Sequence, residues 1–179
     1  ESTGLFDLQI LATNDKDWAA EAPARVRVDL DRPGREFQFG HRLAELVDDY
    51  RLTHVVYVGA GAAPLIGAPE IARIVESILK ADEQVVTNNL HSTDWAAFVP
   101  AGVIKGYEGR VRRDNSLAWG LHREAGLAVE SWPASAASRL DIDTPTDLLV
   151  LALCEGHGAR LAAQLSSQAL DTSRMEQAR

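Results

Sequence analysis

Hydrophobic residues recur with two different spacings along this chain, and the two spacings alternate. Near the start, apolar residues of segments 5–12 and 26–30 alternate with polar ones, which predicts two short strands. Residues 15–22 between them predict a short helix that Pro23 ends, since proline lacks the amide that would continue it. The chain is therefore expected to open with a strand, a helix and a second strand.

The rest of the sequence continues this alternation. Apolar residues at helical spacing predict helices over residues 38–51, 69–79, 116–125 and 159–170, and Pro145 begins another one. Apolar or alternating runs predict strands over residues 54–58, 84–87, 127–132 and 140–143. Residues 92–99 predict a short helical turn that Pro100 ends. A turn is predicted at residues 31–34, and the polar tail after residue 170 is expected to fray.

Alternating strands and helices predict an α/β fold, with a mostly parallel central sheet and helices on both of its faces. The sequence contains neither repeats nor a low-complexity linker, so residues 1–179 are expected to form a single domain. In such folds ligands bind beyond the carboxyl ends of the strands. The loops after Val58, Thr87 and Ile142 are expected to meet at that edge, and a functional site is predicted there.

Charge and composition narrow the possible partners. The net charge of −8 argues against nucleic acid as a partner, because a nucleic-acid-binding protein needs a basic face to neutralise phosphates. No apolar run approaches the length of about twenty residues that a membrane-spanning helix requires, so no membrane partner is expected. The single cysteine, Cys154, excludes an internal disulfide and favours a cytoplasmic location. Monomer and homodimer both remain open.

The segment from Asp141 to Leu148 carries the strongest chemical signal. Thr144, Pro145 and Asp147 together predict the start of a helix with a capping box. Asp141 and Asp143 come just before it, at the end of a predicted strand. Carboxylates held beside a helix N-terminus can bind a cation against a phosphate. The alternative is that these residues only cap the helix.

The glycine-rich loop after Val58 suggests a dinucleotide-binding fold, because Gly59 and Gly61 lie between a predicted strand and a helix. Two features argue against that interpretation. Pro64 replaces the third glycine of the fingerprint, and the next strand ends at Thr87 without the acidic residue that would bind a ribose. A dinucleotide-binding Rossmann domain is therefore kept only as an alternative.

Two segments resemble one known superfamily. Asp141-Ile142-Asp143-Thr144-Pro145-Thr146-Asp147-Leu148 resembles the closing D-[IV]-D-T-P-x-D-L motif of nucleotidyltransferases with a glycosyltransferase-A-like fold. Val55 to Val58 followed by Ala62-Ala63-Pro64-Leu65-Ile66 is similar to the strand and D-x-P-L-[LV] element of that superfamily. Its members include molybdenum cofactor guanylyltransferase, phospholactate guanylyltransferase and cytidylyltransferases. The resemblance covers residues 38–155.

This resemblance implies a Rossmann-like sheet of the nucleotide-diphospho-sugar transferase type. It also implies an Mg²⁺-dependent enzyme, whose partners are a nucleoside triphosphate and a small-molecule acceptor. The reaction would transfer a nucleoside monophosphate to a phosphate or hydroxyl group and release pyrophosphate. By position, Asp143 is the implied catalytic metal ligand and Asp141 the second ligand, while Gly59 and Gly61 are expected to contact the nucleotide.

Other polar residues are also candidates. Asn88 and Asn89 follow a strand at the predicted edge, where they could contact the nucleotide or acceptor, or form a loop with satisfied side chains. Arg110, Arg112 and Arg113 form a basic cluster that could meet a phosphate or could simply be solvated.

Two departures from the superfamily leave other functions open. Ala62 stands where the superfamily has its first metal-binding aspartate, so a catalytically degenerate relative that binds a ligand or partner is the alternative to an enzyme. Nothing before Leu5 resembles the glycine-rich basic loop that wraps the triphosphate in these enzymes. The sequence is expected either to lack that loop or to be the C-terminal major part of a longer domain.

Overall fold

The chain divides into two compact units, and the division follows Phe37. The computed structural model describes residues 4–32, 34, 36–168 and 170. The single domain expected over residues 1–179 remains a prediction. Within the described part of the chain, no helix is long and apolar enough to cross a bilayer.

The first unit is a strand, a helix and a second strand, as the sequence predicts. β1 (Ile10–Thr13) and β2 (Arg27–Leu30) pair in parallel, with Ile10 opposite Arg27. α1 (Lys16–Ala20) connects them, and the Asp15 side chain caps it by accepting hydrogen bonds from two backbone amides of the first turn. β1 is shorter than the predicted segment 5–12. The turn predicted at residues 31–34 includes Pro33, which lies outside the described residues.

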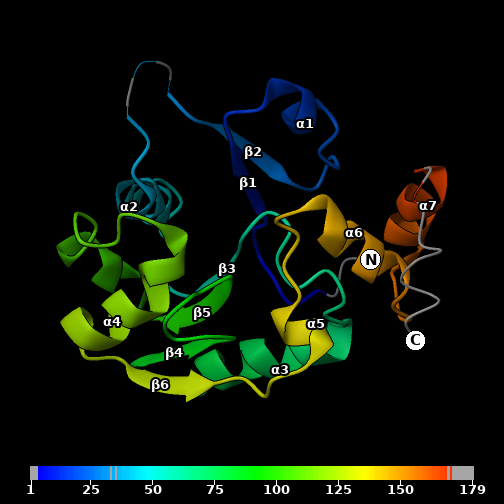
Figure 1. The fold of residues 1–179 in the computed structure, drawn as a ribbon. Coiled ribbons are helices and arrows are strands. Elements are labelled where there is room, and N and C mark those ends of the chain that lie inside the picture. Colours follow the sequence, from blue (N-terminus) through cyan, green and yellow to red (C-terminus); the bar gives the residue numbers. More distant parts are fainter. Residues whose placement is uncertain (1–3, 33, 35, 169, 171–179) are drawn as a thin grey trace. The chain divides into compact units, whose positions relative to one another are not determined.

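The second unit contains the other strands and helices (Figure 1). Its first half comprises α2 (Phe39–Asp49), β3 (Val55–Val58), α3 (Ala68–Leu79), β4 (Gln84–Thr87) and β5 (Trp95–Val99). Its second half comprises the 3-10 helices η1 (Ala101–Gly106) and η2 (Asp114–Ser116), then α4 (Leu117–Ala125), β6 (Ala128–Ser131), α5 (Ala136–Arg139), α6 (Pro145–Ala152) and α7 (Ala159–Ser167).

A mixed sheet of four strands, in the order β3-β5-β4-β6, forms the centre of this unit. β4 and β6 are parallel, whereas β5 runs antiparallel to both of its neighbours, β3 and β4. The α/β class is therefore confirmed, but the expectation of a mostly parallel sheet is wrong. β3, β4 and β6 do share one direction, and the antiparallel β5 inserts between β3 and β4.

β5 occupies residues for which the sequence predicts a helical turn, and that prediction is wrong. Its five residues, Trp-Ala-Ala-Phe-Val, are all buried. Alanines followed by Pro100 fit a short helix, but a strand covered on both faces also needs a continuous apolar run. Pairing with β3 on one side and β4 on the other decides between these two local structures.

Each face of the sheet has its own hydrophobic cluster. Along β5, Ala96 and Phe98 belong to one cluster, while Trp95, Ala97 and Val99 belong to the other. Successive residues of a strand point to opposite faces, so this one strand contributes to both clusters. α2, η1 and α4 cover the first face and α3 covers the second (Figure 1). The predicted helices on both faces are therefore present.

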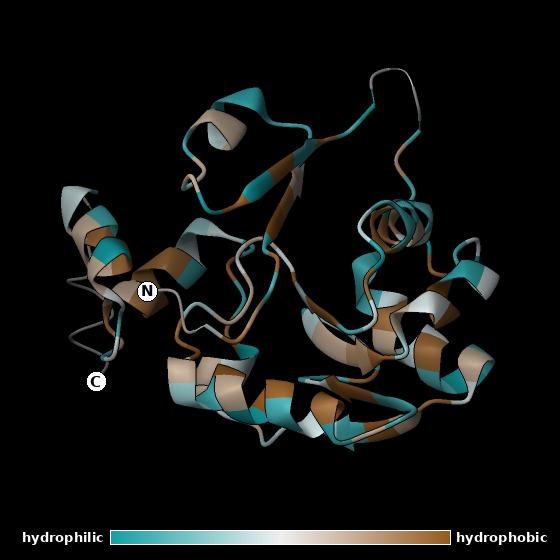
Figure 2. Ribbon diagram, turned by 180° about the vertical axis from the view of Figure 1, so that it is seen from behind, coloured by the Kyte–Doolittle hydropathy of each residue, from teal (hydrophilic) through white to brown (hydrophobic). Residues whose placement is uncertain are grey.

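α2 and α3 are amphipathic, as predicted. Hydrophobic and hydrophilic residues intermingle along α3 (Figure 2), and Ile74, Val75 and Ile78 are buried. Leu79, predicted on the same face, is 63% exposed at the last position of the helix. The periodicity therefore predicts the buried face of the helix correctly, but the burial stops before the helix ends.

The C-terminal part departs from the prediction at one strand and at one helix, since no helix is predicted where α5 lies. Residues 140–143 form no strand, because α5 ends directly before them and they continue as a loop. α4 and α6 follow the prediction, and Gly126 closes α4 with φ of 78°, a left-handed conformation that glycine adopts without strain. α7 ends at Ser167 rather than at residue 170. The polar tail after residue 170 lies outside the described residues.

Gly40 lets α2 pack very close to the segment after η1. The Gly40 amide donates to the carbonyl of Val111 at 2.8 Å, and a Cβ at Gly40 would lie 2.2 Å from the backbone oxygen of Glu108. We predict that Gly40→Ala lowers the unfolding free energy by about 3 kcal/mol, because the backbone must move to admit a methyl group. Denaturant unfolding measures this change. Gly102→Ala is the control, since nothing lies within 4 Å of its added Cβ, and an equal loss in both variants would refute the prediction.

Candidate functional site

The loops after β3 and β4 lie at one edge of the sheet, as the sequence predicts, and the loop of residues 140–143 contacts the first of them. β3 and β4 run in the same direction, so their carboxyl ends lie at the same edge. The amide of Gly59, in the loop after β3, donates a hydrogen bond of 2.9 Å to the carbonyl of Asp94, at the end of the loop after β4. The third loop, residues 140–143, contacts the first one through its backbone.

Two backbone hydrogen bonds join the first and third loops. The Ala63 amide donates to the carbonyl of Leu140 at 2.9 Å, and the Ile142 amide donates to the carbonyl of Gly61 at 3.2 Å. This pairing explains why residues 140–143 have the sequence pattern of a strand, although their partner is a loop. The two segments that resemble nucleotidyltransferase motifs are thus in direct contact.

The two glycines of the first loop have a steric role. Gly61 has φ of +89°, and a Cβ there would lie 3.0 Å from the carbonyl oxygen of Ile142. A Cβ at Gly59 would lie 3.1 Å from the carbonyl oxygen of Asp94. Both glycines therefore allow the loops to approach each other closely. Their contact with a nucleotide stays a prediction.

Asp94 lies at this edge and is a candidate residue that the sequence pattern did not reveal. It directly precedes β5, and an antiparallel strand begins at the edge where its neighbours end. Accordingly, Trp95 lies opposite Val58, and Ala96 lies opposite Thr87. The helical turn predicted for residues 92–99 would not have placed Asp94 at this edge of the sheet. Reading the apolar run after Asp94 as a buried strand would have revealed it.

Asn88 holds Asp94 in place. Asn88 is 1% exposed, and its Nδ2 donates to Oδ2 of Asp94. Its Oδ1 accepts hydrogen bonds from the backbone amides of Asp94 and Trp95 at 3.2 and 3.4 Å. The Oδ1 of the adjacent Asn89 accepts a hydrogen bond from the His91 amide at 3.1 Å. Asn88 is thus a positioning residue for Asp94, and contact of either asparagine with a substrate stays a prediction.

Tyr57 lies close to three carboxylates at this edge. Its hydroxyl donates to Oδ2 of Asp114 at 2.9 Å. Burial raises the pKa of Tyr57 far above its ordinary value, and the negative charges of Asp114, Asp141 and Asp94 raise it further. The phenol therefore stays protonated at physiological pH and remains a hydrogen-bond donor that orients Asp114.

The carboxylates of Asp94, Asp114 and Asp143 each repel that of Asp141, and these four residues are termed the acidic cluster. Burial raises the pKa of Asp141, and the charges of Asp143, Asp94 and Asp114 add to the increase. A hydrogen bond of 3.1 Å from the Ile142 amide to Oδ1 of Asp141 acts in the opposite direction. None of the four forms an ion pair with another described residue. A cation bound at this edge would relieve the repulsion.

Asp147 belongs to the helix cap rather than to the acidic cluster. Its Oδ2 accepts hydrogen bonds from the Thr144 amide at 2.7 Å and from the Thr144 hydroxyl at 2.8 Å. These bonds lower the pKa of Asp147. With Pro145 as the first residue of α6, they confirm the predicted helix start. The helix cap therefore accounts for Thr144 and Asp147, but the carboxylates of Asp141 and Asp143 take no part in it.

The acidic cluster suits Mg²⁺ if a substrate completes the coordination. Across the residues that the structure describes, no three His, Cys, Asp or Glu side chains are arranged to hold a metal ion. Mg²⁺ commonly takes one or two carboxylates and keeps waters or substrate phosphates as its other ligands. Asp141 and Asp143 could supply those carboxylates, whereas Ala62 in the neighbouring loop has no ligating group.

No model of a known protein family matches the chain, and no curated protein matches it significantly. The molecule is an α/β protein with a mixed four-stranded sheet and an acidic cluster where three loops meet.

We predict that Asn88→Ala lowers the unfolding free energy by about 3 kcal/mol, because it leaves two buried or half-buried amides and a carboxylate without their partner. Denaturant unfolding checks the value. Asn89→Ala is the matched control, since the Asn89 side chain accepts one backbone hydrogen bond, and a loss of about 1 kcal/mol is expected there. Equal losses in the two variants would show that Asn88 does not anchor the loop.

Asp141→Asn and Asp147→Asn are predicted to change stability in opposite directions near neutral pH. The folded-state pKa of Asp141 is raised above its ordinary value of 3.8, so its ionised form costs stability above the raised pKa. Asp141→Asn should therefore raise the unfolding free energy by roughly 0.5 kcal/mol. That gain should fade as the pH falls through the raised pKa and vanish below the ordinary value.

The sign is reversed for Asp147. Its pKa is lowered from 3.8, so its ionised form stabilises the fold above the ordinary value and Asp147→Asn removes that contribution. Denaturant unfolding of both variants and the unmodified protein, from neutral pH to about pH 4, measures the two effects. A change of the same sign in both variants at neutral pH would contradict the electrostatic description of the site.

Proposed function

We propose that this protein is a magnesium-dependent nucleotidyltransferase, which transfers a nucleoside monophosphate from a nucleoside triphosphate to a phosphate or hydroxyl group of a small acceptor. The backbone pairing of residues 61–63 with residues 140–142 carries the proposal. These segments contain the two motifs that resemble the superfamily, and such motifs must lie together to serve one ion. Sequence resemblance alone does not require that contact, so it is independent support.

Asp143 and Asp141 are the proposed ligands of Mg²⁺, and phosphates of the nucleotide would supply its other ligands. The bound ion supplies positive charge against the charge that builds on the α-phosphate. With a phosphate acceptor, an acceptor oxygen forms a bond to the α-phosphorus. The bond from that phosphorus to the bridging oxygen breaks, and pyrophosphate leaves with the electron pair. Asp94, held by Asn88, would add negative charge near the ion without serving as a third ligand.

A ligand-binding relative without catalysis is the second candidate function. Ala62 favours it, because the superfamily's first metal-binding aspartate is missing at that position. So does the lack, within the described ranges, of three side chains arranged around one metal position. Such a protein would keep the three loops and bind a nucleotide or a partner without transferring a group.

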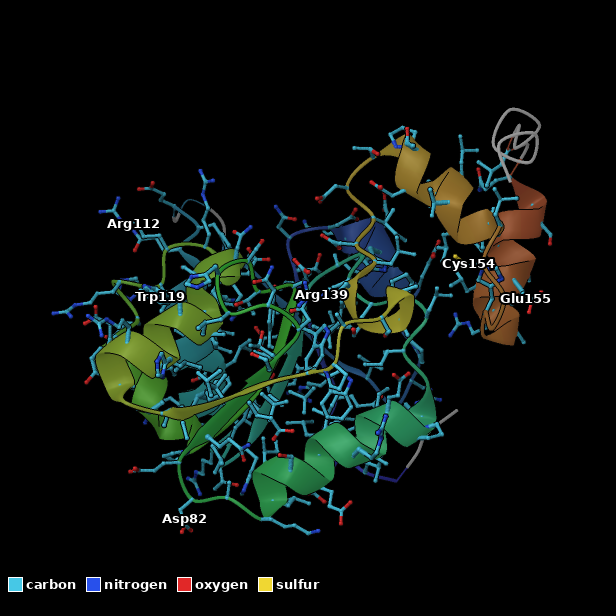
Figure 3. The ribbon with its side chains drawn as sticks, turned by 60° about the horizontal axis from the view of Figure 1, so that its bottom comes forward. Asp82, Arg112, Trp119, Arg139, Cys154 and Glu155 are labelled. Atoms are coloured by element: carbon cyan, nitrogen blue, oxygen red, sulfur yellow. The ribbon has the colours of Figure 1, made fainter. Side chains whose placement is uncertain are left out.

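Isothermal titration with each nucleoside triphosphate, with and without Mg²⁺, tests the proposal. We predict Mg²⁺-dependent binding of at least one triphosphate, and Asp143→Asn should weaken it at least about tenfold, because a neutral amide is a poorer ligand for a hard cation. Asp82→Asn is the charge-matched control. Asp82 precedes β4 and therefore lies at the opposite end of that strand from the candidate site, in the loop after α3, where Figure 3 labels it.

Three results would count against the enzyme. Binding of no triphosphate would exclude the enzyme and would leave the second candidate only as a protein that binds a partner. Equal weakening by Asp143→Asn and Asp82→Asn would remove Asp143 from the metal site. Binding that survives Asp143→Asn, with no pyrophosphate released from any acceptor mixture, would favour the second candidate.

A further inference from the structure

A pocket of about 370 Å³ lies on the second unit, beside the acidic cluster. Its lining residues come from the loop after β4, from the segment before α4 and from α4 itself, namely His91, Arg112, Arg113, Asn115, Ser116 and Trp119. These six residues define the arginine pocket. It gathers two guanidinium groups in a protein whose net charge is −8. A basic pocket on an acidic protein suits an anionic ligand.

The two arginines of the pocket differ from their neighbour Arg110. The Arg110 guanidinium forms an ion pair with Glu124. Within the described part of the chain, neither Arg112 nor Arg113 forms an ion pair, and both are exposed. Their donors are therefore free to bind an anion, and the planar guanidinium matches phosphate with two parallel hydrogen bonds.

Trp119 gives the pocket an aromatic wall. It is 41% exposed on α4, although its neighbours Leu117, Ala118 and Leu121 are buried. Its ring and that of His91 lie with centroids 4.9 Å apart and planes at 39°. Figure 3 shows Arg112 and Trp119 on the same side of the second unit, Arg112 on the loop before α4 and Trp119 on α4. A planar ligand could stack on the indole while its anionic group meets the arginines.

The arginine pocket and the acidic cluster share two loops. Asn115 of the pocket directly follows Asp114 of the cluster. The carbonyl of Asn115 accepts a hydrogen bond of 3.0 Å from the Thr93 amide, and Thr93 directly precedes Asp94. A small molecule in the pocket would therefore lie on the two segments that carry Asp94 and Asp114 of the acidic cluster.

We propose that the arginine pocket binds a small phosphate monoester with a planar organic part, and that this molecule is the acceptor substrate. The phosphate meets Arg112 and Arg113, and the planar part stacks on Trp119. Identifying the ligand as the acceptor rests on the proposed function. The binding of a planar phosphate monoester in the pocket is independent of the proposed function, because this binding requires neither Mg²⁺ nor a nucleotide.

Titration with phenyl phosphate, without Mg²⁺ or nucleotide, tests the pocket through tryptophan fluorescence and calorimetry. We expect a saturable change in tryptophan emission. Trp119→Phe should abolish this change while calorimetry still detects binding, since phenylalanine keeps an aromatic wall without the indole. Phenol, which has the ring alone, and inorganic phosphate, which has the anion alone, should each bind at least about tenfold more weakly than phenyl phosphate.

The arginines are tested by matched substitutions. The double variant Arg112→Gln with Arg113→Gln should weaken phenyl phosphate binding at least about tenfold, while Arg110→Gln should leave it unchanged. Unfolding curves of the three proteins should coincide within about 0.5 kcal/mol, because the changed side chains are exposed. The proposed pocket would be refuted if phenyl phosphate showed no saturable binding. It would also be refuted if Arg110→Gln weakened that binding as much as the double variant does.

The two proposals fail in different ways. A protein that binds phenyl phosphate through Arg112 and Arg113 but binds no triphosphate keeps the phosphate pocket and loses its assignment as the acceptor site. A protein that binds Mg²⁺ and a triphosphate but not phenyl phosphate keeps the proposed function and refutes the pocket. Loss of phenyl phosphate binding on adding a triphosphate would show that the nucleotide occupies the pocket, which would also overturn the acceptor assignment.

Discussion

The fold of the second unit depends on burying β5 between β3 and β4. Every residue of β5 is buried, and its side chains alternate between the two hydrophobic clusters that hold the helices on the sheet. Because β5 is antiparallel, it begins at the edge where both neighbours end. The same pairing that closes the core therefore sets Asp94 beside the loops that follow β3 and β4.

Backbone hydrogen bonds hold the loops of the candidate site together, and acidic side chains on these loops give the site its negative charge. Hydrogen bonds from Gly59, Ala63 and Ile142 tie three loops together, so the acidic residues on them are held at one place. Burial raises the pKa of Asp141, and repulsion by the neighbouring carboxylates raises it further. This repulsion opposes folding, and a bound cation would relieve it. Asn88 and Tyr57 keep two of the carboxylates oriented despite that repulsion. A site that costs stability in this way is common where proteins bind charged ligands.

Much of the local structure could be predicted from the sequence, because short-range rules fix it. The predicted strand at residues 84–87 has the same bounds as β4, and the buried face of α3 follows its 3.6-residue spacing. The start of α6 follows from Thr144, Pro145 and Asp147, whose hydrogen bonds involve only neighbours in the chain. The acidic pair in the same motif was likewise visible in the sequence, since its candidacy depended on residue type and position alone.

Longer-range choices were made only by the tertiary structure. Residues 95–99 and 140–143 both have sequences that permit more than one backbone conformation, and their partners decided the outcome. Asp94 entered the site because of the direction of β5, which no local pattern records. Arg112 and Arg113 differ from Arg110 only in what lies near them. The sequence by itself therefore determined most of the helices, most strands and the paired acidic residues, because those depend on neighbours in the chain. Strand direction, loop pairing and the separation of paired from unpaired charges required the tertiary structure, because they depend on contacts between distant segments.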